Sequence, residues 1–371
     1  MLRPSKLYSA VIATLGVLSS LMYGFQSSDA TGMWVAKGSM AAARSGACAA
    51  SLPDGRVLIT GGQGPTGSMN TAEIFTADGS FSAAAGMAGA RSGHSCATLE
   101  DGQILVAGGS NEFGAVSTAE VFDPGLNRWA PAGNMVSARS GHTATVLRDG
   151  RVLIAGGQGA ATVYDTLEIF DPAANSFQSL SPAALASPRE LHAAALLPDG
   201  RVLIAGGANG SRALASSDVF DPRTGAVTRG PNLSAARAGV SATTLLDGRV
   251  LIAGGSDDSQ DLATAELYNP ETGSFSLAGR MTEARRGQIA VLLPHNNQVL
   301  LIGGDRNGTS AEVFTPWRGT FRPTGNLDQV RSGAVASPVG ADGVLVLAGG
   351  RSGSATLQSS RTYRFATLKT D

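Results

Sequence analysis

The sequence predicts an all-β protein made of seven similar units, each with four short antiparallel strands. Paired glycines recur at intervals of 46 to 50 residues, and an apolar run such as VLIAGG leads into each pair. In six units an Asp-Gly dipeptide comes before this run, as the turn of a hairpin. A fixed period near fifty residues is typical of architectures in which similar units stack. The pairs begin at Gly61, Gly108, Gly156, Gly206, Gly254, Gly303 and Gly349.

The third unit shows the four predicted strands in order. Its first strand lies between the segment 135–142 (MVSARSGH) and the turn at Asp149-Gly150. The second strand lies within 151–157 (RVLIAGG), an apolar run of the kind expected for a strand buried on both faces. A variable loop leads to the third strand within 167–172 (LEIFDP), and the fourth strand contains Phe177.

Aromatic residues recur in the last two strands of the units, which indicates packing within each unit. The third strands carry Phe75, Phe122, Phe170, Phe220, Tyr268, Phe314 and Tyr363. Most fourth strands carry a second large residue, namely Phe81, Trp129, Phe177, Phe275 and Phe321. The fourth unit has only Val227 there, so we expect its core to be less well filled.

Four-stranded units with this period resemble kelch repeats, which stack as blades of a β-propeller like that of galactose oxidase. The resemblance covers residues 33–365. WD40 blades also have four strands, but their period is about 40 to 45 residues and no Trp-Asp dipeptide of their signature occurs here. The last unit ends after its third strand, and residues 32–40 (GMWVAKGSM) match the fourth-strand pattern. We therefore expect a seven-bladed propeller closed by the N-terminal strand, with Trp34 in the core of the last blade.

Residues 1–30 have the pattern of a secretion signal, in which basic residues precede a long apolar stretch. Ser28 and Ala30 provide small residues for cleavage after Ala30. The mature protein would then be a single propeller over residues 31–371. The length of the apolar stretch is also compatible with an uncleaved membrane anchor. Either interpretation places the propeller outside the cytoplasm, as a secreted, periplasmic or cell-surface protein.

Charge and cysteine content exclude other classes. The chain has 28 Lys and Arg against 29 Asp and Glu, so it lacks the basic excess that nucleic-acid binding requires. Two cysteines are too few for a disulfide scaffold and are not at metal-binding spacing. Cys48 and Cys96 lie four and five residues after an arginine of their unit, which places them on opposite faces of their strands. We therefore do not expect a disulfide between them.

An arginine precedes each first strand, and six units carry an acid near the third strand. Pairing of these charges is the expected structural role, since catalysis seldom needs six equivalent carboxylates. In the seventh unit Arg361 occupies the acidic position, so Arg331 is expected to lack this partner. The arginines of the six expected pairs are Arg44, Arg91, Arg139, Arg189, Arg237 and Arg285, and the acids are Glu73, Glu120, Glu168, Asp218, Glu266 and Glu312.

Three histidines form a second repeated feature. His94, His142 and His192 each lie three residues after the arginine, in consecutive units. Convergence on a metal ion is one interpretation, but equivalent positions in adjacent blades are rarely close enough to share an ion. We therefore expect hydrogen-bonded histidines, no metal and no cofactor. His295 lies beside the hairpin turn of the sixth unit and is expected to face water.

The loops between second and third strands vary, and variable loops on a rigid scaffold often bind ligands. In a propeller they share one face with the segments that precede the first strands. Asp257, Asp258 and Asp261 are also candidates for a calcium site, although a solvated acidic loop is the simpler interpretation. The ligand-binding candidates on this face are Asn111, Asp257, Asp258, Asp305, Arg306, Arg331, His94, His142 and His192, with Asn70, Glu112 and Phe113 as further loop residues.

The resemblance to galactose oxidase implies a comparison with its copper site, which uses tyrosines, histidines and a tyrosine joined to cysteine. After residue 30 the chain has only Tyr164, Tyr268 and Tyr363, and two of these occupy the core aromatic position. No nucleophile elbow or HExxH motif is present, and we assign no catalytic residue. We expect a monomeric, non-enzymatic module that binds an extracytoplasmic protein or glycan. The alternative is a carbohydrate-active enzyme, epimerase-like or oxidase-like, with an axial pocket.

Overall fold

The computed structural model describes residues 32–293, 296–340 and 344–365. One compact unit comprises residues 33–364, and a second comprises 1–32 with 365–371, nearly all of it outside the described residues. The predicted signal at residues 1–30 and the expected exposure of His295 therefore lie outside the described residues. Within those residues no helix has the length and hydropathy needed to cross a bilayer.

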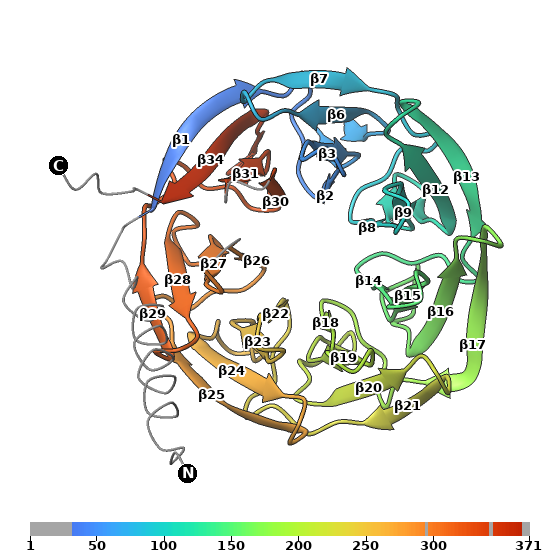
Figure 1. The fold of residues 1–371 in the computed structure, drawn as a ribbon, viewed down its shortest axis with the longest axis vertical. Coiled ribbons are helices and arrows are strands. Elements are labelled where there is room, and N and C mark those ends of the chain that lie inside the picture. The colour runs from blue at the N-terminus through green and yellow to red at the C-terminus, as the bar shows by residue number, and fades with distance from the viewer. Residues whose placement is uncertain (1–31, 294–295, 341–343, 366–371) are drawn as a thin grey trace, which may run out of the picture. The chain divides into compact units, whose positions relative to one another are not determined.

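Seven four-stranded antiparallel sheets form a ring, which confirms the seven-bladed propeller (Figure 1). In each blade the first strand is innermost and the fourth is outermost. The blades, in chain order, are β2 (Cys48–Ser51), β3 (Val57–Thr60), β6 (Ala72–Phe75) and β7 (Phe81–Ala84); β8 (Ser95–Thr98), β9 (Ile104–Ala107), β12 (Thr118–Asp123) and β13 (Arg128–Asn134); β14 (Thr143–Val146), β15 (Val152–Ala155), β16 (Thr166–Asp171) and β17 (Ser176–Ala184); β18 (Ala193–Leu196), β19 (Val202–Ala205), β20 (Ser217–Asp221) and β21 (Ala226–Arg229). The remaining blades are β22 (Ser241–Thr244), β23 (Val250–Ala253), β24 (Thr264–Asn269) and β25 (Ser274–Arg280); β26 (Ile289–Leu292), β27 (Val299–Ile302), β28 (Ala311–Thr315) and β29 (Thr320–Pro323); β30 (Val335–Val339), β31 (Val344–Ala348), β34 (Ser359–Phe365) and β1 (Gly32–Ser39).

The N-terminal strand completes the seventh blade, as the sequence predicts. The order in this sheet is β1-β34-β31-β30, so the first strand of the chain pairs with its last (Figure 1). The rings of Trp34 and Tyr363 lie 5.0 Å apart, and Trp34 Nε1 donates to the carbonyl oxygen of Gly325 in blade six. This closure joins the two ends of the chain in one sheet and leaves no unpaired blade edge between them.

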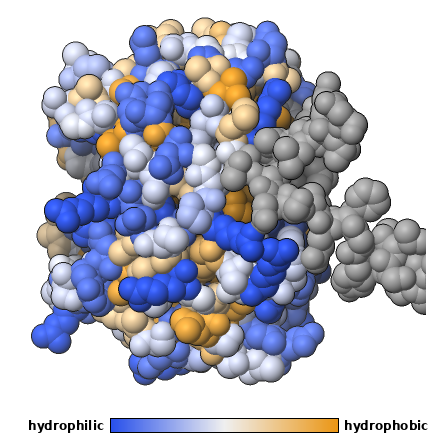
Figure 2. Space-filling view, turned by 90° about the vertical axis from the view of Figure 1, so that its left-hand side faces the viewer, coloured by the Kyte–Doolittle hydropathy of each residue, from blue (hydrophilic) through white to orange (hydrophobic). Residues whose placement is uncertain are grey.

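Each blade packs its own core and shares it with the next blade. The second strands are buried along their length, and the predicted aromatic pairs form in five other blades with ring centroids 4.7 to 5.1 Å apart. In blade four Val227 lies opposite Phe220 in place of a second ring. On the side of the ring that includes β1 and β29, hydrophilic and hydrophobic residues are interspersed (Figure 2).

The arginine before each first strand joins three segments of its own blade. In blade three, Arg139 Nη1 donates to the carbonyl oxygens of Gly156 (2.7 Å) and Thr166 (3.2 Å). Its Nη2 donates to Thr166 Oγ1 (3.0 Å) and Glu168 Oε1 (2.7 Å). The Glu168 carboxylate also accepts the backbone N–H groups of residues 136 and 137, which precede the arginine. Both side chains are almost completely buried, at 0 and 1% exposed.

The same contact recurs in the first six blades, always within one blade. The pairs are Arg44–Glu73, Arg91–Glu120, Arg139–Glu168, Arg189–Asp218, Arg237–Glu266 and Arg285–Glu312, with N–O distances of 2.6 to 3.0 Å.

Blade seven departs from this arrangement. Arg331 keeps the backbone contacts, donating to the carbonyl oxygens of Gly349 (3.0 Å) and Ser359 (2.8 Å). Among the described residues, no carboxylate forms a salt bridge with it. Arg361 stands in the acidic position and pairs instead with Asp328. A buried arginine therefore remains in this blade without its own anion.

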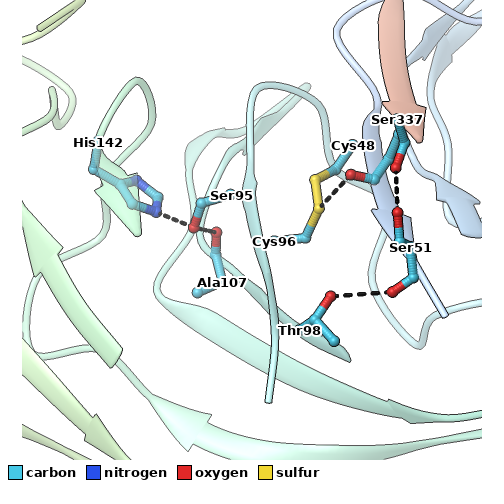
Figure 3. The surroundings of a disulfide bond; sticks show 9 residues. Cys48, Ser51, Ser95, Cys96, Thr98, Ala107, His142 and Ser337 are labelled. Carbon is cyan, nitrogen blue, oxygen red and sulfur yellow. Dashed lines mark hydrogen bonds between the residues drawn. A yellow bond between two sulfur atoms is a disulfide. The ribbon is translucent and has the colours of Figure 1, made fainter. Parts of the chain in front are cut away.

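The structure contains a disulfide between Cys48 and Cys96, so the expectation of two unpaired cysteines is wrong (Figure 3). The Cα atoms are 6.1 Å apart, on the innermost strands of blades one and two. The error has a geometric cause. Adjacent blades pack face against face, so the interface receives one face from the first blade and the opposite face from the second. Residues on opposite faces of equivalent strands are therefore the ones that meet.

Replacing Glu168 with alanine is expected to lower the free energy of unfolding by about 3 to 5 kcal/mol, because Arg139 would remain buried without an anion. Denaturation in guanidinium chloride measures the change.

Asp149→Ala in the same blade is the matched control, because it removes a carboxylate whose arginine partner, Arg151, is partly exposed. It should cost less than about 1 kcal/mol. Equal losses in the two variants would contradict a special role for the buried pair.

Candidate functional site

The candidate residues gather on the face formed by the segments before the first strands and the loops after the second strands. Short β-bridges join these two segments in the blades, for example Ser45 with Gln63 and Ser92 with Ser110. At the axial end of this face, the residue two positions after each of the seven arginines has a positive φ. Six units place glycine there, with φ between 59° and 67°.

Leu191 takes this position in blade four, with φ 53° and a side chain that is 53% exposed. A left-handed conformation costs a leucine roughly 1 to 2 kcal/mol, a cost that glycine avoids. Blade four therefore has an exposed leucine near the axis, at a position where the other six units have glycine. The sequence analysis did not single out this residue, although the replacement of Gly by Leu in the repeat was a visible signal.

The three histidines lie buried between blades, at 6 to 8% exposed. His142 Nε2 is 2.8 Å from Ser95 Oγ on the preceding blade (Figure 3), and His192 Nε2 is 2.9 Å from Thr143 Oγ1. In blade six Gln288 takes the same position and donates from Nε2 to Ser241 Oγ at 3.0 Å. The imidazole also packs over a glycine pair, since a Cβ added to Gly108 would lie 2.7 Å from the ring of His142.

Burial holds these imidazoles in the neutral form. The pKa values of His94, His142 and His192 are lowered to about 3, first by desolvation and then by the nearby positive arginine of the same blade. They contact neighbouring blades, and among the described residues no three His, Cys, Asp or Glu side chains are grouped to hold a metal ion. The described residues therefore form neither the three-histidine site nor the calcium site considered above.

The acidic candidates serve mainly to order their own loops. Asp257 Oδ1 accepts the N–H groups of residues 259 and 260, and Asp258 Oδ1 accepts the N–H of Ala213 in blade four. Asp261 pairs with Arg286 at 3.3 Å. Asp305 is buried and caps its loop by accepting the N–H groups of residues 307 and 310, whereas its neighbour Arg306 is exposed.

Three loops form two-stranded hairpins on blades seven, one and two. They are β32 (Arg351–Ser352) with β33 (Ala355–Thr356), β4 (Gln63–Gly64) with β5 (Gly67–Ser68), and β10 (Ser110–Asn111) with β11 (Gly114–Ala115). Asn111 Oδ1 accepts the N–H of Phe113 at the tip of the last hairpin, and the Phe113 side chain is 97% exposed. Glu112 Oε1 accepts the N–H of Ser68 at 2.6 Å, which ties the hairpins of blades one and two. Asn70 lies outside the hairpins, between β5 and β6, and its Nδ2 donates to the carbonyl oxygen of Met87.

A cavity of about 410 Å³ lies on the same face, lined by residues of blades four to seven. Arg331 lines it, as expected for a candidate near the axis, together with Leu191 and Arg286, which the sequence analysis did not include. The remaining candidates, including the three histidines, do not line it. The structure thus divides the predicted site between a hairpin surface, a loop cluster and this cavity.

Stability should fall with acidification because, between pH 6.5 and 3, the histidines are neutral in the folded protein and protonated in the unfolded chain. Each has a folded pKa near 3 and an unfolded value near 6.5, so the unfolded chain binds more protons between these pH values. This stability is fully present above pH 6.5 and is lost as the pH falls towards 3. His142→Gln, which keeps the hydrogen bond as Gln288 does, should make the unfolding free energy less pH-dependent, by about 1.4 kcal/mol per pH unit.

Denaturation of both proteins in a pH series from 8 to 4 measures this difference. The reverse variant, Gln288→His, should steepen the dependence by a similar amount. Parallel curves for all three proteins would contradict the assignment of neutral buried histidines.

The described residues do not fit a copper site of the galactose oxidase kind. Tyr268 and Tyr363 pack in blade cores. The guanidinium group of Arg139 lies over the ring of Tyr164, with its Cζ atom 4.8 Å from the ring centroid. Both cysteines of the chain are in the disulfide, so none is available for a bond to tyrosine. We therefore derive no step through a copper ion.

Comparisons with known proteins agree with this fold. The chain is similar to a solved structure described as a novel fungal alcohol oxidase with catalytic diversity among the AA5 family, in complex with copper. The TM-score is 0.74 at 17% sequence identity, covering 90% of this chain and 75% of that one, so the likeness concerns the fold alone. No curated protein matches the chain in sequence. The family model described as the KLHDC2/KLHL20/DRC7 Kelch-repeats domain matches residues 93–304, more than half of the chain. The chain therefore belongs to this Kelch-repeat family.

Proposed function

We propose that this chain is an extracytoplasmic, non-enzymatic binding module whose hairpin surface binds a protein or a glycan. The hairpin surface consists of the loops 63–68, 110–115 and 351–356. The observation that carries the proposal is the exposure of Phe113, a residue that is 97% exposed at a hairpin tip. A phenyl ring held in water on an ordered hairpin provides an apolar anchor, and buried aromatic residues often dominate binding energy.

The hairpins offer a pre-organised surface. They come from three successive blades around the ring, since the seventh is followed by the first. The bond from Ser68 N–H to Glu112 holds two of them together, and the Asn111 carboxamide fixes the turn that carries the ring. Because these loops are already ordered, binding would require little further loss of conformational entropy.

Two observations support a location outside the cytoplasm. The first 30 residues have the sequence pattern of a secretion signal, with an uncleaved anchor as the other interpretation. The Cys48–Cys96 disulfide is the second, because such bonds form and persist mainly in oxidising compartments.

The cavity lining favours binding over catalysis. Among the described residues, two arginines and no carboxylate or histidine line the cavity, so these residues offer no pair of groups for proton transfer near neutral pH. The acids of the blades are occupied by buried arginines and backbone N–H groups. A carbohydrate-active enzyme is therefore the less supported alternative.

Phe113→Ala should remove most of the retention of a partner without changing the melting temperature, because the side chain makes few contacts within the propeller. Immobilised protein would be tested against cell-envelope extracts and a glycan array, with washes at fixed ionic strength. We expect at least a tenfold loss of the bound ligand.

Leu277→Ala is the matched control, since Leu277 is 70% exposed on the outermost strand β25 of blade five. It should retain the ligand. A ligand that is kept by Phe113→Ala and lost by Leu277→Ala would place the binding surface on the outer edge of the ring.

A further inference from the structure

Six of the seven interfaces between blades are closed by one repeated hydrogen bond. The N–H of the second glycine in each pair donates to the carbonyl oxygen of the arginine of the next blade. The bonds are Gly62 to Arg91, Gly109 to Arg139, Gly157 to Arg189, Gly207 to Arg237, Gly255 to Arg285 and Gly350 to Arg44, at 2.8 to 2.9 Å. Between blades six and seven, whose residues here are all described, Gly304 makes no such bond to Arg331.

Among the described residues, other close contacts seen at most interfaces are also missing here. A Cβ added to the first glycine would clash with the arginine carbonyl oxygen of the next blade in the other six units. At Gly303 the nearest atom would be Gly308 O, at 3.5 Å within the same loop. Within the described residues, the bond between axial residues is also missing here, because Gly287 accepts no N–H from Gly333, just as Gly141 accepts none from Leu191 between blades three and four.

The sequence explains why the sixth interface differs. The loop after β27 is shorter than its equivalents, and Arg286 N–H donates to Gly304 O instead of to the next residue along. Ala334 occupies the position at which His94, His142, His192 or Gln288 extends over the preceding glycine pair. Blade one also has an alanine, Ala47, at this position and still forms the bond from Gly350 to Arg44, so the short loop is the feature that distinguishes the sixth interface.

The cavity of about 410 Å³ described above includes this interface and extends to lining residues of blades four and five, and its volume is within the range of small-molecule sites. Apolar side chains line much of it, including Leu191, Ile289 and Ile302. Its charged lining residues are Arg286 and Arg331, both cationic. Gly304 and Gly333 also belong to the lining. Within the described residues, the N–H of Gly304 lacks the arginine carbonyl acceptor found at the other six interfaces, and the N–H of Gly333 has no backbone acceptor.

Arg331 adds a buried charge that no carboxylate of the described residues neutralises in a salt bridge. It is 6% exposed, and the acidic position of its blade holds Arg361, whose own partner is Asp328. Burial lowers the pKa of Arg331 and the neighbouring Arg361 lowers it further, while Asp328 acts in the opposite direction without forming a salt bridge to Arg331. In Arg44 and Arg91 the bonded glutamate of the same blade opposes the effect of burial on the pKa. A negative ligand nearby would supply the charge that every other blade obtains from its own carboxylate.

We propose that the cavity between blades six and seven binds a small carboxylate with an apolar body. The carboxylate would interact with the positive charges of Arg331 and Arg286 and with the free glycine N–H groups, and the apolar body would pack against Leu191 and the isoleucines. Leu191 fits this role, because an exposed leucine stands there in a backbone conformation that favours glycine. The site is separate from the hairpin surface and does not depend on the proposed function.

Isothermal titration of the purified protein with benzoate, and with benzamide as the neutral isostere, tests the proposal at fixed ionic strength. Benzoate should bind with saturation, and benzamide at least tenfold more weakly, because only the charged ligand interacts with the arginines. Absence of benzoate binding, or equal affinity for both compounds, would overturn the proposal.

Two substitutions locate the site. Ala334→Gln should fill the cavity, as Gln288 does at the preceding interface, and Arg331→Gln should remove the buried charge; each is expected to weaken benzoate binding at least tenfold. Ala334→Gln changes no charge and no buried arginine, so it keeps the test decisive if Arg331→Gln does not fold. Phe113→Ala should bind benzoate as the parent does. Unchanged affinity in Ala334→Gln would refute this location, whatever the outcome at the hairpin surface.

Discussion

The buried arginine before each innermost strand is the contact on which the rest of the propeller depends. Its planar guanidinium group joins the end of the second strand, the start of the third and the segment that enters the first. In six blades a carboxylate neutralises it and also accepts backbone N–H groups, two in four of these blades and one in blades four and five. The arginine's carbonyl oxygen then accepts the N–H of a glycine in the preceding blade, so one residue organises both the blade and its interface.

The functional proposals arise where this repeat is broken. Blade seven replaces the acid with Arg361, and the interface before it lacks the bond from Gly304. Blade four places Leu191 where the other units have glycine, and blade two carries Phe113 on its hairpin. We expect function at positions that depart from the repeat without an evident structural gain, because packing requirements alone would favour the residue used by the other units.

Much of the fold could be predicted because each repeated residue has a physical role that the sequence states seven times. The hairpin turns, the closure by Trp34 and the missing partner of Arg331 all followed from comparing units. The disulfide was missed because the argument considered the faces of single strands, whereas adjacent blades pack opposite faces together. An axial pocket was considered only in the alternative function, with Arg331 as a candidate, and its position beside the sixth interface was missed. The signals were the short sixth loop and Ala334, but their effect required knowing that the third residue after each arginine spans an interface.

The most direct test of this account is amide hydrogen exchange at single residues. The N–H of Gly304 should exchange markedly faster than those of Gly157 and Gly255, which are bonded to the arginine carbonyl oxygens of the next blades. Equal protection of the three amides would mean that blades six and seven close like the others. That result would contradict the claim that the sixth interface lacks the hydrogen bond that closes the other six.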